Sequence, residues 1–187
     1  MVVMNRELME HIRRGDRYAF EKLFREWYPR LCYFASRYVG STDISRDVVQ
    51  EVFIRLWDRR EEIDIQFSVK AYLYRAVKNQ ALSHLRSTKQ EMALHEIPEK
   101  EDASESSYLL DDESLFGSKN FSKLIWREVE ELPEQRRTIF VLYRKHGLSY
   151  KEIAAVLGIT RKTVENQMGR SLMFLRQRLQ AEKFTPL

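Results

Sequence analysis

The segment that most restricts how this chain folds is LSYKEIAAVLGIT, residues 148–160. Ser149 and Glu152 have the spacing of a capping box, in which each residue satisfies a backbone N–H of the other, and this predicts that a helix begins there. Gly158 favours the left-handed turn that ends a helix, and Thr160 is a suitable N-cap for the next helix. The segment therefore predicts two helices joined by a tight turn.

The helix predicted after Thr160 combines a buried stripe with a polar surface. Apolar residues recur every three or four positions, as in a helix with one buried face: Val164, Met168, Leu172, Leu175 and Leu179. Polar residues fill most other positions of its first turns: Arg161, Lys162, Glu165, Asn166, Gln167 and Arg170. Basic and amide groups on these turns suit the DNA major groove, because they can pair with phosphates and base edges.

Two interpretations fit this helix pair, a DNA-binding unit and an ordinary helical hairpin. In the first helix we expect Ile153, Ala154 and Leu157 to face inward, with the small side chain of Ala154 where the second helix approaches closely. An ordinary helical hairpin would also turn its charged residues toward water. We favour a DNA-binding helix-turn-helix because Ala154, Gly158 and Val164 occur together, in order, among apolar residues.

Charge is unevenly distributed along the chain of 187 residues, whose net charge is +4. Residues 1–90 contain 17 Lys and Arg against 12 Asp and Glu, residues 125–187 contain 12 against 7, and residues 91–124 contain 3 against 9. Only 6 Gly and 4 Pro occur, and alternating apolar patterns are scarce. We predict an all-α protein with two small helical domains, residues 1–90 and 121–187, joined by a flexible acidic linker, residues 91–120.

Within the first predicted domain, residues 17–86 have the periodicity of three or four packed helices. In the second, helical order returns at Phe121, and Pro133 is expected at the first position of a helix toward Tyr143. The three tryptophans are expected to anchor the cores: Trp27, Trp57 and Trp126.

A helix predicted over residues 44–59 has one apolar face and one acidic, amide-rich face. The apolar positions are Val48, Val49, Val52, Phe53 and Leu56. The opposite positions are Asp47, Gln50, Glu51, Ile54 and Asp58. A helix in contact only with solvent usually mixes both charge signs, so an acidic face around an exposed isoleucine favours a protein partner.

A second predicted helix, residues 69–86, has one buried face and one basic, amide-rich face. Its buried positions are Leu73, Val77 and Ala81, and its polar side carries Arg75, Asn79, Ser83 and Arg86. Aromatic residues lie on or near it: Phe67, Tyr72 and Tyr74. Cations and amides among aromatic rings favour single-stranded nucleic acid, because the rings stack on unpaired bases while the cations hold the backbone.

Other classes of function lack their sequence signals. Cys32 is the only cysteine and the four histidines are scattered, so we expect neither a disulfide nor a metal site. No glycine-rich phosphate loop is present, and we expect no cofactor, no small-molecule substrate and no enzymatic activity. Without an apolar run of signal-peptide or membrane-spanning length, a cytoplasmic protein is expected.

The two helices and the helix-turn-helix together resemble extracytoplasmic-function sigma factors of the sigma-70 family. The resemblance is carried by DVVQEVFIRLW at residues 47–57, by KAYLYRAVKN at residues 70–79 and by residues 148–160. Their order and spacing match the second and fourth conserved regions of that family. The similarity spans residues 17–88 and 121–179.

The resemblance implies three sets of contacts and several partners. On the polymerase core, the beta-prime clamp helices would be bound by Asp47, Gln50, Glu51 and Ile54. The melted minus-ten strand would be held by Phe67, Lys70, Tyr72, Arg75, Lys78, Asn79, Ser83 and Arg86. The minus-35 element would be read by Arg161, Lys162, Thr163, Glu165, Asn166 and Arg170. The beta flap and an anti-sigma factor, which can be membrane-bound, are the other implied partners. Ser83 departs from the family pattern, since many members carry an acidic residue there.

Two other classes of DNA-binding protein fit the sequence less well. A site-specific recombinase with a terminal helix-turn-helix would need an alternating strand pattern around a nucleophilic serine, and residues 1–60 show none. A repressor or activator that binds operators alone would leave the acidic face of the residue 44–59 helix and the aromatic residues near Phe67 unexplained. A gel shift without polymerase distinguishes it from a sigma factor.

Overall fold

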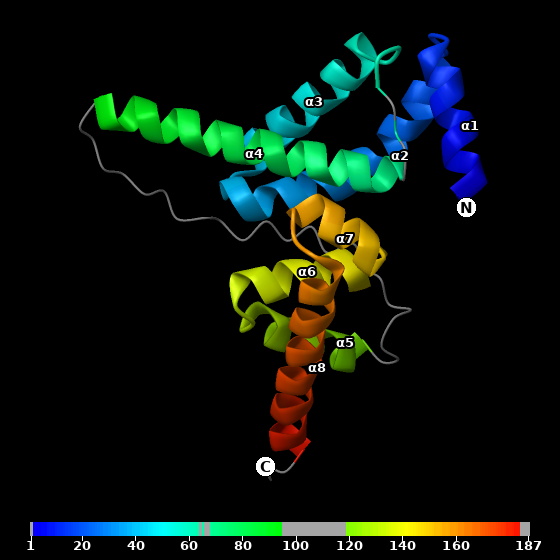
Figure 1. Ribbon diagram of the computed structural model, residues 1–187. Coiled ribbons are helices and arrows are strands. Elements are labelled where there is room, and N and C mark those ends of the chain that lie inside the picture. The colour runs from blue at the N-terminus through cyan, green and yellow to red at the C-terminus, as the bar shows by residue number, and fades with distance from the viewer. Residues whose placement is uncertain (1, 64, 66–67, 95–118, 184–187) are drawn as a thin grey trace. The chain divides into compact units, whose positions relative to one another are not determined.

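The computed structural model describes residues 2–63, 65, 68–94 and 119–183. Its described residues form eight helices and no strand, which confirms the predicted all-α class. The chain divides into two compact units, Met1–Tyr108 and Leu109–Leu187 (Figure 1). None of the described helices is both long and apolar enough to cross a membrane.

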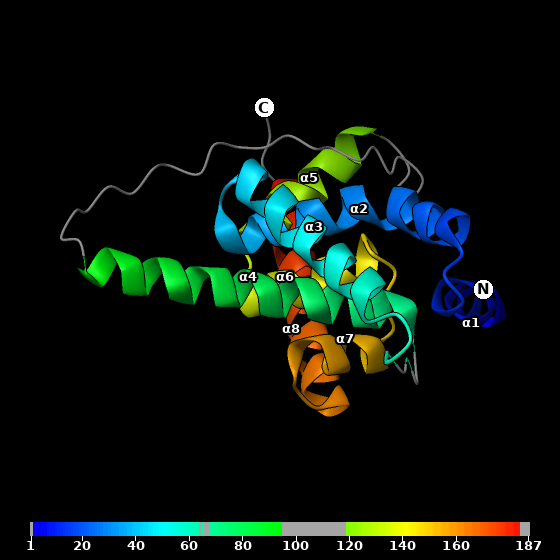
Figure 2. The same ribbon diagram turned by 90° about the horizontal axis from the view of Figure 1, so that it is seen from above.

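The first unit is built from four helices: α1 (Val2–Arg13), α2 (Arg17–Val39), α3 (Thr42–Asp58) and α4 (Val69–Leu94). Helices α2, α3 and α4 pack against one another, and α1 packs on α2 and α4 (Figure 2). The largest fully buried side chains of their core are Ile12, Leu23, Leu31, Phe34, Leu56, Leu73 and Tyr74. As predicted, the apolar face of α3 lies in this core, and so do Leu73, Val77 and Ala81 of α4.

Local signals fix where these helices begin and end. The Asp16 carboxylate accepts hydrogen bonds from two backbone N–H groups of the first turn of α2, at 3.0 and 3.1 Å. The Ser41 hydroxyl accepts the corresponding bond at the start of α3. Between them, Gly40 ends α2 with φ of 69°, in the left-handed region that glycine adopts readily.

Two features of the first unit differ from the sequence prediction. Helix α1 was not predicted, yet its Met9 and Ile12 are buried against the other helices. Helix α4 continues past Arg86 to Leu94 and so enters the segment predicted as linker. The hydroxyls of Ser87 and Thr88 donate to carbonyls of the preceding turn, so these polar side chains are satisfied within the helix. Residues 95–118, the remainder of that segment up to α5, lie outside the described residues.

The second unit consists of α5 (Lys119–Glu130), α6 (Glu134–Arg144), α7 (Tyr150–Leu157) and α8 (Arg161–Lys183). Helix α8 packs against the other three. Fully or almost fully buried residues of this core are Val129, Leu132, Ile139, Phe140, Leu142, Leu148, Ile153 and Val164.

The predicted start of α6 and the predicted burial of the three tryptophans were partly wrong. Pro133 caps α6 from outside, with ψ of 141°, and the helix starts one residue later than predicted. Trp27 is buried in the first unit as expected, with 5% of its surface exposed. Trp57 and Trp126 are only half-buried, because each lies at the edge of its core beside a cation, Arg60 or Lys145.

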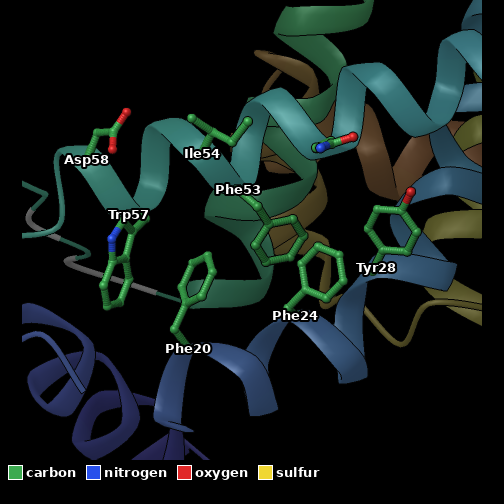
Figure 3. Close-up of a pocket in the computed structure, with 8 residues that line it drawn as sticks. Phe20, Phe24, Tyr28, Phe53, Ile54, Trp57 and Asp58 are labelled. Atoms are coloured by element: carbon green, nitrogen blue, oxygen red, sulfur yellow. The ribbon is translucent and has the colours of Figure 1, made fainter. Parts of the chain in front are cut away.

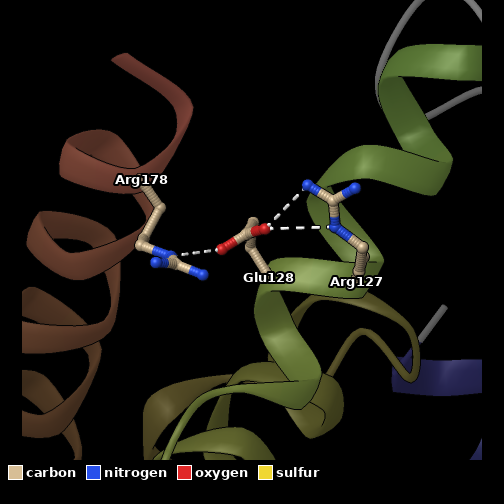
Figure 4. Close-up of polar contacts among 3 residues, drawn as sticks. All are labelled: Arg127, Glu128 and Arg178. Atoms are coloured by element: carbon tan, nitrogen blue, oxygen red, sulfur yellow. Dashed lines mark hydrogen bonds and ion pairs between the residues drawn. The ribbon is translucent and has the colours of Figure 1, made fainter. Parts of the chain in front are cut away.

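A buried carboxylate joins α5 to the C-terminal half of α8. The Glu128 side chain is 3% exposed and accepts a 2.7 Å hydrogen bond from Nε of Arg178, fifty residues later. Its other oxygen accepts from Arg127 at 3.1 and 3.2 Å (Figure 4). These hydrogen bonds, of which the one from Arg178 has the largest effect, hold the pKa of Glu128 below its usual value despite the burial.

Replacing Glu128 by glutamine is expected to destabilise the second unit by about 1 to 2 kcal/mol at neutral pH, since charge-assisted hydrogen bonds are lost. Because the folded-state pKa lies below the unfolded value near 4.5, the contribution is present above that pH and is lost as pH falls through the lowered pKa. Thermal melts from neutral to acid pH should therefore show the difference between wild type and Glu128→Gln shrinking below about pH 4.5.

The matched control is Glu130→Gln on the same helix. Glu130 forms a 3.0 Å ion pair with Arg137, but its side chain is half exposed, so its removal is expected to cost at most about 0.5 kcal/mol. Equal effects of the two substitutions at neutral pH would contradict the special role of the buried pair.

Candidate functional site

Helices α7 and α8 form the helix-turn-helix that the sequence predicts. The Ser149 hydroxyl accepts from the Glu152 N–H at 3.3 Å, and the Glu152 carboxylate accepts from the Ser149 N–H at 2.8 Å, so the capping box is complete. Gly158 ends α7 with φ of 71°. The Thr160 hydroxyl then accepts from the Thr163 N–H at 3.0 Å and caps α8.

The inward faces of the two helices differ in part from the prediction. Ile153 of α7 is buried as expected, but Val156 is its buried partner, while Ala154 and Leu157 are only half-buried. On α8, Val164, Met168 and Leu175 are buried, whereas Leu172 is 53% exposed. Ser171 takes the inward position instead and is fully buried, and its hydroxyl donates to the Gln167 carbonyl at 2.8 Å, so the buried polar group is satisfied.

The polar residues predicted to contact DNA gather on the first turns of α8. Arg161, Lys162, Asn166 and Arg170 are exposed, and Thr163 and Glu165 are half-buried. Within the free chain, Arg161 donates to the Glu165 carboxylate at 2.9 Å, and Lys162 lies 4.0 Å from it. The Thr163 hydroxyl is bonded to that of Thr160. The N-terminal half of α8 thus presents cations and an amide to solvent, with one carboxylate held beside two of the cations.

The outer face of α3 is the second candidate surface. Asp47, Gln50 and Ile54 are exposed, and Ile54 keeps 47% of its surface accessible. Glu51 is half-buried and accepts a 2.8 Å hydrogen bond from Arg55 one turn on, so its charge is partly compensated. Asp47 forms no hydrogen bond or ion pair with the other described residues, which leaves its carboxylate available to a partner.

A groove lined by aromatic residues, which the sequence pattern did not predict, borders this face. It measures about 450 Å³ and is lined from α2 and α3 by Phe20, Phe24, Tyr28, Gln50, Phe53, Ile54, Trp57 and Asp58 (Figure 3). The rings of Phe20 and Trp57 lie 4.9 Å apart, as do those of Phe24 and Phe53. The four-residue spacing of Phe20, Phe24 and Tyr28 was the signal that could have revealed it, because such residues share one side of a helix.

The third surface is the polar side of α4. Arg75, Asn79, Ser83 and Arg86 are all exposed along it, in agreement with the predicted division of this helix. Lys70, Tyr72 and Lys78 are half-buried; burial, with the positive charge of Arg75, lowers the pKa of Lys78. Phe67 lies outside the described residues.

Comparisons with known proteins match both units. A model of sigma-70 region 2 matches residues 23–91, and a model of sigma-70 region 4 matches residues 122–175. The chain is 30% identical over 169 residues to the ECF RNA polymerase sigma-E factor of Escherichia coli K12, with 88% of both chains covered. It belongs to the ECF sigma factors. The ECF sigma factor SigW of Bacillus subtilis is 28% identical, over 96% of this chain and 98% of that protein.

Solved structures have the same fold. CnrH, in complex with the cytosolic domain of CnrY, has a TM-score of 0.61 at 23% identity and covers 95% of this chain and 97% of its own. RpoE of Bartonella quintana, in complex with the anti-sigma factor NepR, also scores 0.61 at 21% identity, covering 86% and 96%. In this sigma factor, region 2 thus contains α3 and the polar side of α4, while region 4 contains the helix-turn-helix.

Proposed function

We propose that this sigma factor binds core RNA polymerase and brings it to a restricted set of promoters, where transcription starts. The proposal rests on one observation: this ECF family member has both a helix-turn-helix and a separate exposed face on α3. A protein that only bound operators would need the first surface and not the second. The polymerase supplies the chemistry, and the sigma factor selects where it acts.

Each surface has a proposed partner. Helix α3, through Asp47, Gln50, Glu51 and Ile54, would dock on the beta-prime clamp helices, and the aromatic groove beside Ile54 would enlarge this contact. The polar side of α4 would hold the unpaired minus-ten strand, since its cations and amides face solvent. The start of α8 would read the minus-35 element, and the second unit would also contact the beta flap.

An anti-sigma factor is a further proposed partner. Two solved structures with this fold are complexes, one of CnrH with the cytosolic domain of CnrY and one of RpoE with the anti-sigma factor NepR. By analogy, an inhibitor that covers the α3 face would keep this sigma factor from the core until it is released.

Purified protein alone is expected to bind promoter duplex weakly, whereas with core polymerase it should direct transcription from a restricted promoter set. Each DNA-contacting surface is small, so the affinity of the free chain should remain near that of non-specific binding, with a Kd of about 10⁻⁶ M or weaker. Gel shifts with and without core, together with sequencing of transcript starts, measure both effects. Tight operator binding without core would instead favour a stand-alone repressor or activator.

A further inference from the structure

Gly169 is the one glycine among the described residues that no turn explains. Gly15, Gly40, Gly147 and Gly158 have φ between 63° and 83°, a conformation that glycine adopts more readily than other residues. Gly169 instead lies within α8, where only proline is less favourable than glycine.

The surroundings of Gly169 do not require a glycine either. The residue is exposed, and a Cβ atom built on it would meet nothing within 4 Å beyond its chain neighbours and the adjacent backbone of its own helix. Alanine would therefore fit the free chain without strain. It would also favour the helix, raising the folding equilibrium constant about fivefold. Nothing among the described residues of the isolated protein therefore calls for a glycine at this position.

Gly169 lies on the outward side of α8, among the residues proposed to contact DNA. Lys162, Asn166, Gly169 and Met173 follow one another at intervals of four, three and four residues, so they share one side of the helix. All four are exposed, and Met173 keeps 58% of its surface accessible. The opposite side of α8 carries the buried Val164. Gly169 leaves the backbone bare at the middle of the outward side, one turn after Asn166.

We propose that Gly169 is where the backbone of α8 comes closest to the minus-35 DNA, and that its missing side chain sets how deeply the helix enters the groove. The proposal rests on the proposed function, because it assumes that α8 reads this element. Gly169 is then a positioning residue. A Cβ at this point would push the helix outward and lengthen the contacts that Asn166 makes with the bases.

The test compares holoenzymes containing wild type, Gly169→Ala and Gly169→Leu. Because a close-packed contact resists extra atoms, Gly169→Ala is expected to weaken binding to a duplex with the minus-35 element by about fivefold or more, and Gly169→Leu by more than that. Binding to a pre-melted minus-ten fragment that lacks the minus-35 element should not change. In the free chain, Gly169→Ala is expected to raise the melting temperature.

Two control variants separate the possible outcomes. Gln180→Ala, at an exposed position three turns further along α8, should bind like wild type, whereas Asn166→Ala should lose minus-35 selectivity. Unchanged binding by Gly169→Ala, with Asn166→Ala impaired, would overturn the close-approach role and leave the proposed function intact. If both variants bind like wild type, the assignment of α8 fails as well. A lower melting temperature of Gly169→Ala would also overturn the proposal, because the glycine would then serve folding.

Discussion

Charge reversal at Asp47 is expected to weaken binding of the core polymerase roughly tenfold or more, because a lysine there would oppose the positive charge that an exposed carboxylate is suited to meet. Asp47 is exposed and forms no hydrogen bond or ion pair with the other described residues, so Asp47→Lys should change the free energy of unfolding by only about 0.5 kcal/mol. Competition between labelled wild-type chain and each variant for core polymerase measures the affinity, and circular dichroism checks the fold.

The charge-matched control is Glu26→Lys. Glu26 is an exposed residue of α2 in the same unit, and it does not line the aromatic groove beside α3. Its reversal changes the net charge equally but should leave core binding close to that of wild type. Glu51→Lys should also weaken binding, although the Arg55 partner already compensates part of that charge. Full core affinity of a folded Asp47→Lys variant would show that α3 is not the docking surface.

Alanine at Asn166 is expected to relax promoter preference at one or two minus-35 positions, because loss of a good bidentate base contact removes about 1 to 3 kcal/mol of discrimination. Asn166 is exposed on the second turn of α8, and Glu165 beside it should behave similarly. Lys162→Ala should instead weaken holoenzyme binding to all promoters alike. It should also reduce by about 1 the slope of log affinity against log salt concentration, as expected for loss of a phosphate contact. Transcription across a randomised minus-35 library at two salt concentrations, with the minus-ten element fixed, separates these effects.

The structure makes Glu165 the less direct of the two tests. Arg161 donates to the Glu165 carboxylate at 2.9 Å, so Glu165→Ala also releases a cation that could find a phosphate. Asn166→Ala has no such secondary effect within the described residues, so its result should decide whether α8 reads the minus-35 element. If it leaves the selected motif unchanged while a substitution at Arg75 alters the minus-35 positions, the roles of α8 and α4 have been assigned wrongly.

The sequence by itself determined the features that depend on neighbouring residues. Ser149, Glu152 and Gly158 predict the bounds of α7 because a capping box and a left-handed glycine act on backbone groups within one turn. The apolar face of α3 and the buried positions of α4 also followed, since the 3.6-residue period alone places such residues on one side of a helix.

Only the tertiary structure decided what depends on distant partners. No local pattern marks Glu128 as buried, because its burial requires a cation that the chain supplies fifty residues later, at Arg178. Leu172 is 53% exposed although it continues an apolar stripe, and its neighbour Ser171 is buried instead, with its hydroxyl satisfied by the Gln167 carbonyl. The aromatic groove exists only because α2 and α3 lie side by side, and Met9 and Ile12 of α1 are buried only where α2 and α4 cover them. Whether a residue is buried depends on how the helices pack. The helical period shows which residues share one side of a helix, but not which other element packs against that side.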